Sequence, residues 1–136
     1  VMEIMYCDAC CNVKYNQGSY AIIGHNFKVS GIISPNTRLH SGYCELYAVY
    51  EALRLAKNRE VKIYTDSQAI ANRVNKDYYV EKTTGRSNYN RLMTKTKIKY
   101  ELSNCIIEKI SRKKNKEADK LARKTMKKWR KERGLI

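Results

Sequence analysis

Alternating apolar and polar residues predict three strands at the start of the chain. Residues 3–12, E-I-M-Y-C-D-A-C-C-N, favour a strand, and N-Q-G at 16–18 marks a turn. Two apolar stretches within 18–34, G-S-Y-A-I-I-G-H-N and F-K-V-S-G-I-I-S, fit a hairpin. We therefore expect an antiparallel meander, followed by a loop at 35–42.

A helix is predicted at 43–57, where apolar residues recur at helical spacing. Ser41 or Gly42 is the expected N-cap. The small residues of this helix recur every fourth position, which allows it to pack closely against a sheet. They are Ala48, Ala52 and Ala56.

The second half of the chain continues with alternating strand and helix patterns. The predicted elements are a strand at 61–66, a short helix at 67–75, a polar irregular segment at 76–88, a helix at 88–102, a strand at 105–110 and a strongly amphipathic helix at 115–131. A meander followed by strand–helix units predicts an α/β fold, with a five-stranded mixed sheet covered by helices on both faces.

Length and charge limit the classes of function. A chain of 136 residues is expected to form one domain, 1–136. Its net charge is +15, from 28 Lys and Arg against 13 Asp and Glu, which indicates an anionic partner: nucleic acid or a membrane surface. Thirteen of these cations lie between Lys109 and Arg133, and their one-sided sign favours phosphate binding over a solvated face. No apolar run approaches the roughly 20 residues that span a bilayer.

The five cysteines predict free thiols. C-D-A-C at 7–10 has the spacing of half a zinc site, but no second pair follows, so zinc is the lesser alternative. The first residues, V-M-E-I-M-Y-C-D, contain acids and no basic leader, so we expect no secretory signal. Unpaired cysteines then predict a reducing, cytoplasmic location.

Four carboxylates fall on four separate predicted elements. Asp8 lies within the first strand, where an unpaired buried acid is costly, and Asp66 ends the fourth. Glu45 and Asp119 lie in the first turns of their helices, where favouring the helix dipole is an alternative role. The Asp66-Ser67 pair is equally suited to capping a helix. If the four converge, their mutual repulsion requires bound cations.

Together these strings resemble type 1 ribonuclease H, including the ribonuclease H domains of reverse transcriptases. The strings are Y-C-D-A-C with Asp8, C-E-L-Y-A-V-Y-E-A-L with Glu45, Y-T-D-S-Q with Asp66 and N-K-E-A-D-K-L-A with Asp119. The resemblance covers residues 3 to about 125. It implies the ribonuclease H-like fold and an endoribonuclease that cuts the RNA strand of RNA–DNA hybrids, leaving 5′-phosphate and 3′-hydroxyl ends.

The resemblance also implies two Mg²⁺ ions, with Mn²⁺ as a substitute, about 4 Å apart at the cleaved phosphate. Asp8 would bridge both ions. Glu45 and Asp66 would hold the ion near the leaving oxygen, and Asp119 the ion that activates water. A monomer is expected, with no membrane partner.

Selection of RNA is expected to use contacts to 2′-hydroxyl groups. Gln68 matches a family position best, followed by Cys11 and the backbone of 41–44, which includes Ser41 and Gly42. Asn12 is a candidate contact or a turn residue.

The sequence departs from the family at two places. Ala9 follows the first Asp where many members have Gly, and the loop 111–115 lacks the His that many members carry. Arg112, Lys113 and Lys114 are the candidate phosphate contacts in that loop, although none of them can shuttle protons near neutral pH as His does.

Other functions remain open at this point. One alternative is a module of the same fold that binds nucleic acid without cutting it, which the complete set of four acids disfavours. Another is a nuclease with broader substrates such as double-stranded RNA. The chain can also be one domain of a longer polyprotein.

Overall fold

The computed structural model describes residues 2–34, 38–75 and 88–136. Its elements in chain order are β1 (Glu3–Asn12), β2 (Gln17–Ile23), β3 (Lys28–Ile33), α1 (Ser41–Ala56), β4 (Val61–Thr65), α2 (Gln68–Asn75), α3 (Asn88–Glu101), β5 (Ile106–Lys109), the 3₁₀ helix η2 (Arg112–Lys114) and α4 (Lys116–Glu132). Of the predicted irregular segments, 35–37 and 76–87 lie outside the described residues.

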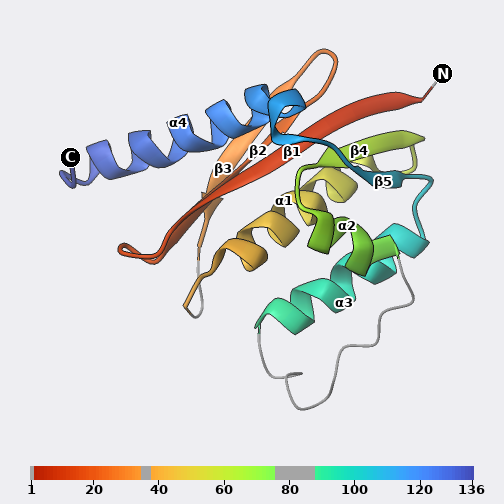
Figure 1. The fold of residues 1–136 in the computed structure, drawn as a ribbon, viewed down its shortest axis with the longest axis horizontal. Helices are drawn as coiled ribbons and strands as arrows, with labels where there is room; N and C mark the ends of the chain where they lie inside the picture. The colour runs from red at the N-terminus through yellow and green to blue at the C-terminus, as the bar shows by residue number, and fades with distance from the viewer. Residues whose placement is uncertain (1, 35–37, 76–87) are drawn as a thin grey trace.

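The strands form one mixed sheet in the order β3-β2-β1-β4-β5. The β1–β2 and β2–β3 pairs are antiparallel, whereas β1–β4 and β4–β5 are parallel. Helix α4 covers one face, and α1, α2 and α3 lie on the other (Figure 1). The predicted five-stranded mixed sheet with helices on both faces is therefore confirmed.

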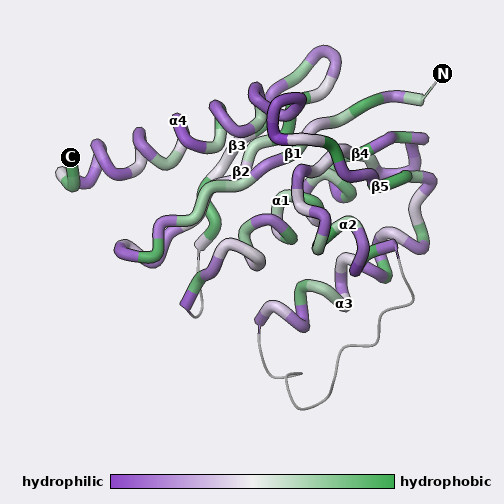
Figure 2. Tube along the Cα trace, viewed as in Figure 1, coloured by the Kyte–Doolittle hydropathy of each residue, from purple (hydrophilic) through white to green (hydrophobic). Residues whose placement is uncertain are grey.

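The main core lies between the sheet and α1. Ala48, Ala52 and Ala56 are almost completely buried there, as their spacing predicted. Gly18 on β2 lies beneath the start of this helix, and an added Cβ would lie 2.6 Å from Cys44 Sγ. The missing side chain thus lets the first turns of α1 approach the sheet. Figure 2 shows hydrophobic residues along the central strands and α1, and a mostly hydrophilic α4.

The start of α1 differs from the prediction. The helix begins at Ser41, and its N-cap is His40, whose Nδ1 accepts a hydrogen bond from the backbone N–H of Tyr43 at 3.2 Å. Ser41 and Gly42 are therefore the first helical residues. Glu45 lies beyond the first turn, which contains no acid, so the helix dipole does not account for it.

Helix α4 is attached to the sheet by two buried hydrogen bonds and an apolar stripe. Ser19 Oγ donates to the Ala122 carbonyl at 2.6 Å, and Asn115 Nδ2 donates to the Cys7 carbonyl at 2.9 Å. Ala118 and Ala122 are fully buried, and Met126 is nearly so. The predicted amphipathic helix is confirmed.

Within the described ranges, no helix is both long and apolar enough to span a bilayer. All five cysteines are unpaired. Cys7 and Cys10 are three residues apart on β1, so their side chains point to opposite sides of the sheet. The lesser alternative of a zinc ion held by this pair does not fit this arrangement.

Candidate active site

The parallel register of β1 and β4 brings Asp8 beside Asp66. The last paired residues are Tyr6 and Tyr64, whose rings stack with centroids 5.4 Å apart. Asp8 and Asp66 each follow two residues later, so both side chains point to the same face at the end of this ladder. Because β1 and β4 are neighbours in the sheet, these two acids face each other across the ladder.

Asp119 reaches the same place from α4. It lies in the first turn of this helix, as predicted, and its carboxyl group is close enough to Asp8 to help raise the pKa of Asp8. It also accepts a hydrogen bond from Arg123 Nε at 3.0 Å, one helical turn further on. Asp119 is thus placed between the strand acid and a cation of its own helix.

Glu45 completes the group from α1. Asp8, Glu45 and Asp66 line one cavity of about 360 Å³, together with Cys11, Ser41, Arg112 and Arg123 among others. The four predicted acids are therefore gathered at one end of the sheet, three on the cavity wall and Asp119 close to one of them, Asp8.

Asp8 is buried without a cationic partner. It is 9% exposed, and its Oδ1 accepts one hydrogen bond, from the backbone N–H of Ala9 at 2.8 Å. Burial, with the nearby charges of Asp66 and Asp119, raises the pKa of Asp8 to about 7, although the Ala9 hydrogen bond acts against the rise.

A second buried acid, Glu51 on α1, has the cationic partner that a buried carboxylate ordinarily has. It is 5% exposed, and its Oε2 accepts two hydrogen bonds from Arg54, at 2.7 and 3.1 Å. A buried carboxylate is costly unless it is paired, and Glu51 is paired. Asp8 has no Lys or Arg within ion-pair distance among the described residues, so its charge calls for a different partner.

Asp66 does not cap the helix that follows it. The capping bond is made by Ser67, whose Oγ accepts from the backbone N–H of Ile70 at 3.3 Å. Of the two roles left open for this pair, Ser67 takes the cap, and the Asp66 carboxylate lines the cavity.

The donor chemistry of these residues fits a hard divalent cation, because Mg²⁺ and Mn²⁺ prefer carboxylate oxygens. In this arrangement, however, no three His, Cys, Asp or Glu side chains within 2–34, 38–75 and 88–136 form a group that can hold a metal ion. Asp119 is engaged by Arg123 instead. The site thus contains suitable ligands that are not yet arranged around a common point.

The predicted substrate contacts are divided by the fold. Cys11, Ser41 and Arg112 line the cavity. Gln68 is exposed at the start of α2, where its Nε2 donates to Asn72 Oδ1 at 2.8 Å, and Gly42 is half-buried in α1.

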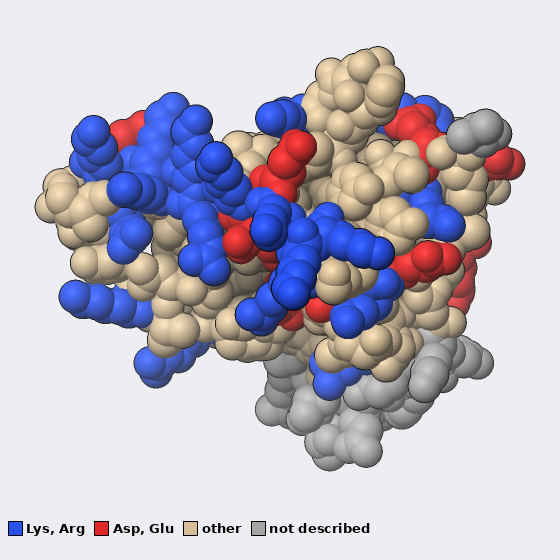
Figure 3. Space-filling model, turned by 45° about the horizontal axis from the view of Figure 1, so that its top comes forward, with Lys and Arg blue, Asp and Glu red and all other residues tan. Residues whose placement is uncertain are grey.

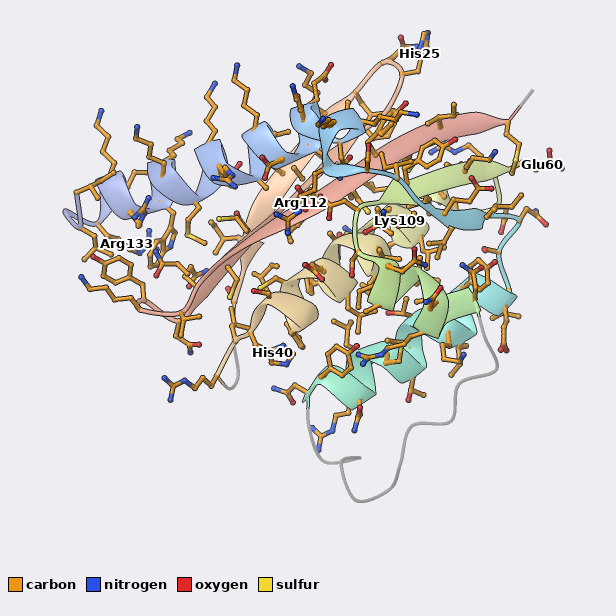
Figure 4. All side chains as sticks on the ribbon, viewed as in Figure 1. His25, His40, Glu60, Lys109, Arg112 and Arg133 are labelled. Atoms are coloured by element: carbon orange, nitrogen blue, oxygen red, sulfur yellow. The ribbon has the colours of Figure 1, made fainter. Side chains whose placement is uncertain are left out.

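Three other candidate contacts do not line this cavity. Asn12 Oδ1 accepts from the Tyr15 backbone N–H at 3.2 Å, which is the alternative turn role. Lys113 and Lys114 are exposed on η2 and line a different hollow, near Tyr6. Figure 4 shows Arg112 on the loop between β5 and α4, His25 at the tip of the β2–β3 hairpin and His40 at the start of α1.

Two residues near the acids were not singled out from the sequence. Arg123 follows Asp119 by four residues, a helical spacing that favours an ion pair. Asn115 is 1% exposed and connects the carbonyl of Cys7, immediately before Asp8, to the start of the helix that carries Asp119. The backbone carbonyl of Asn115 also accepts a hydrogen bond from the backbone N–H of Asp119, at 3.1 Å. The sequence signal that could have identified Asn115 is its place as the first residue of the N-x-x-A-D string that ends at Asp119.

The sequence profile of the RNase H family matches residues 2–127. The chain belongs to the RNase H family. The predicted resemblance is therefore confirmed over nearly the whole chain. No curated protein sequence matches the chain significantly.

Solved RNase H structures share the fold. LC11-RNase H1, isolated from compost by a metagenomic approach, is 22% identical with a TM-score of 0.74, and covers 93% of this chain and 96% of its own. RNase H1 from the halophilic archaeon Halobacterium salinarum NRC-1 is 15% identical with a TM-score of 0.71, over 94% and 99%. The N-terminal RNase H domain of Rv2228c from Mycobacterium tuberculosis is 16% identical with a TM-score of 0.71, over 93% and 94%. At these identities the likeness concerns the fold.

Proposed function

We propose that this RNase H family member is a divalent-cation-dependent endoribonuclease that hydrolyses the RNA strand of RNA–DNA hybrids. The observation that carries the proposal is the convergence of Asp8, Glu45 and Asp66 on one cavity, with the charge of Asp119 close to Asp8. The products are expected to carry 5′-phosphate and 3′-hydroxyl ends.

Asp8, Glu45, Asp66 and Asp119 would hold two Mg²⁺ ions, or Mn²⁺ in their place. Asp8 is suited to bridging because it lies between Asp66 on the neighbouring strand and Asp119 on α4. When bound, such ions polarise the phosphate, activate a water molecule and stabilise the leaving oxygen. The unpaired charge of Asp8 favours their binding.

Two arginines bring positive charge to the same cavity. Arg112 and Arg123 line its wall, and both side chains are exposed. A guanidinium group is well suited to phosphate oxygens because it donates several hydrogen bonds in one plane. We expect them to orient the backbone of the RNA strand. They replace the charge of the family's loop His but not its proton transfer.

Cys11, Ser41 and Gln68 are the proposed contacts to the 2′-hydroxyl groups that distinguish RNA from DNA. Cys11 and Ser41 line the cavity. Gln68 is exposed at the start of α2, two residues after Asp66. Gly42 would contribute its backbone. A cytoplasmic location and a monomeric state are proposed with this function.

The test uses hybrids labelled on either strand, with matched RNA duplex and DNA duplex, in Mg²⁺ or Mn²⁺. We expect cleavage of the RNA strand of the hybrid alone, and loss of cleavage in Asp66→Asn. Binding of the hybrid without cutting in either metal would instead support a binding module. Equal cutting of double-stranded RNA would support the broader nuclease.

A further inference from the structure

The positive charge of α4 is concentrated on one side of the helix. Successive residues turn by about 100°, so positions along α4 can be assigned to its circumference. Six cations fall within roughly one third of the circumference, on the same side as Asp119. They are Lys116, Lys120, Arg123, Lys127, Arg130 and Lys131, and we name them the α4 cationic flank. Of the two glutamates of the helix, Glu117 falls about 40° beyond Lys131, at the edge of the flank, and Glu132 falls about 100° beyond it.

The flank begins at the candidate active site and continues along the sheet. Arg123 lines the cavity and bonds to Asp119. Burial raises the pKa of the Cys10 thiol, and the charges of Arg123 and Arg130 act against that rise, which places both guanidinium groups near Cys10, two residues beyond Asp8. Figure 3 shows Lys and Arg side chains gathered over α4, with acidic side chains at the border of this surface.

These cations are almost all without acidic partners. Apart from Arg123, none of the six lies within ion-pair distance of a carboxylate in the described part of the chain. Arg130 is half-buried, and its Nε has no hydrogen-bond partner. Like charges spaced four residues apart on a helix repel each other, as Arg123, Lys127 and Lys131 do here. An anionic partner would remove this repulsion.

The shape of the flank favours a nucleic-acid duplex over a membrane. A basic helix that lies on a bilayer inserts its apolar face, but the apolar face of α4 is buried against the sheet through Ala118, Ala122 and Met126. The helix from Lys116 to Glu132 has 17 residues and is therefore about 25 Å long. A duplex presents one negative charge per about 1.7 Å, so it offers phosphates along this whole length.

We propose that the α4 cationic flank is a second contact surface for the hybrid, which binds its phosphate backbone beyond the cleaved position. This proposal rests on the proposed function for the identity of the duplex. From Asp119 to Lys131 the flank extends about 18 Å, which corresponds to roughly five base pairs at 3.4 Å per step. Hybrids that extend at least this far past the cleaved phosphate gain the contact, and shorter ones do not.

The test measures binding separately from cleavage. Hybrid affinity is followed at 50–300 mM KCl for the intact chain with Asp66→Asn, which prevents turnover. To this background are added either Lys120→Gln, Lys127→Gln and Lys131→Gln, or a control set of Lys28→Gln, Lys57→Gln and Lys62→Gln. Both sets remove three positive charges, but the control set lies on β3, β4 and the end of α1.

The flank set is expected to weaken binding of an 18-base-pair hybrid at least tenfold at 100 mM KCl. It should also make the slope of log affinity against log salt shallower by up to about 2.7, at 0.9 per lost phosphate contact. With a six-base-pair hybrid, the difference in affinity between the flank set and the control set should be much smaller. Equal affinities and slopes for both sets on the long hybrid would overturn the proposal.

Two further outcomes separate the possible failures. If the parent chain does not cut the hybrid but the flank set still reduces its binding, the proposed function fails and the contact surface stands. If the flank set leaves hybrid binding unchanged but reduces binding to vesicles of phosphatidylserine and phosphatidylcholine, the flank is a membrane contact and the proposal is overturned.

Discussion

Replacing Asp8 with Asn removes a buried carboxylate that has no cationic partner. Burial, together with Asp66 and Asp119, raises the pKa of this group from 3.8 to about 7. Each pKa unit corresponds to about 1.4 kcal/mol, so keeping Asp8 ionised in the fold costs up to about 4 kcal/mol. The cavity opens to solvent, which screens these charges, and we therefore expect the replacement to stabilise the fold by about 2–4 kcal/mol at pH 8.

The sign of this effect depends on pH. Between pH 4 and pH 7 the folded protein keeps a proton on Asp8 that the unfolded chain has released. The free energy of unfolding of the parent chain therefore falls as the pH rises through this window, whereas Asn does not titrate. The advantage of Asp8→Asn should be near its full size at pH 8 and small at pH 4.

Urea denaturation from pH 4 to pH 8 in EDTA measures this difference. Glu117→Gln is the matched control, because its side chain is 70% exposed and its pair with Lys28 is 3.8 Å long; a change below about 0.5 kcal/mol is expected. The reasoning is refuted if Asp8→Asn does not stabilise the fold at pH 8, or if its effect is the same at pH 4.

Two other predictions concern the same site. Asn115→Ala should lower the free energy of unfolding by about 1–3 kcal/mol, because the Cys7 carbonyl loses its buried donor. It should also lower kcat, because the start of α4 is no longer fixed to the strand that carries Asp8. Ser19→Ala, which removes the other buried bond of α4, should lower stability in urea but keep kcat; equal losses of kcat would contradict the positioning role. Mg²⁺ at 100 times its Kd should stabilise the parent chain by about 2.7 kcal/mol in thermal melts but not Asp8→Asn; equal shifts would contradict metal binding by Asp8.

The fold was predictable because each element carries its own local signal. Alternating residues mark the strands, and the buried alanines Ala48, Ala52 and Ala56 mark the face of α1 that packs on the sheet. The sequence placed Asp8 within one predicted strand and Asp66 at the end of another, so their proximity depended on whether these two strands pair. Which strands are neighbours could not be predicted from these local patterns, and the structure shows it.

The details that could not be predicted depend on contacts between distant residues. Asn115 and Cys7 are 108 positions apart, and nothing local indicates their hydrogen bond. His40 acts as N-cap although Ser41 and Gly42 are more usual cap residues, because its ring Nδ1 reaches the N–H of Tyr43. Lys113 and Lys114 were grouped with Arg112 by sequence, but the tight turn of η2 directs them away from the cavity.

The central claim is that the four carboxylates act as one catalytic unit. Its most direct test is the single-turnover rate of hybrid cleavage in Mg²⁺ for the parent chain, for each single variant Asp8→Asn, Glu45→Gln, Asp66→Asn and Asp119→Asn, and for the Asp8→Asn/Asp66→Asn double variant. Groups that act as a unit are strongly non-additive, so each single change should remove most of the activity and the double variant should lose little more than the worse single one. A parent-like rate in Asp8→Asn or Asp66→Asn, or losses that simply multiply in the double variant, would contradict the account.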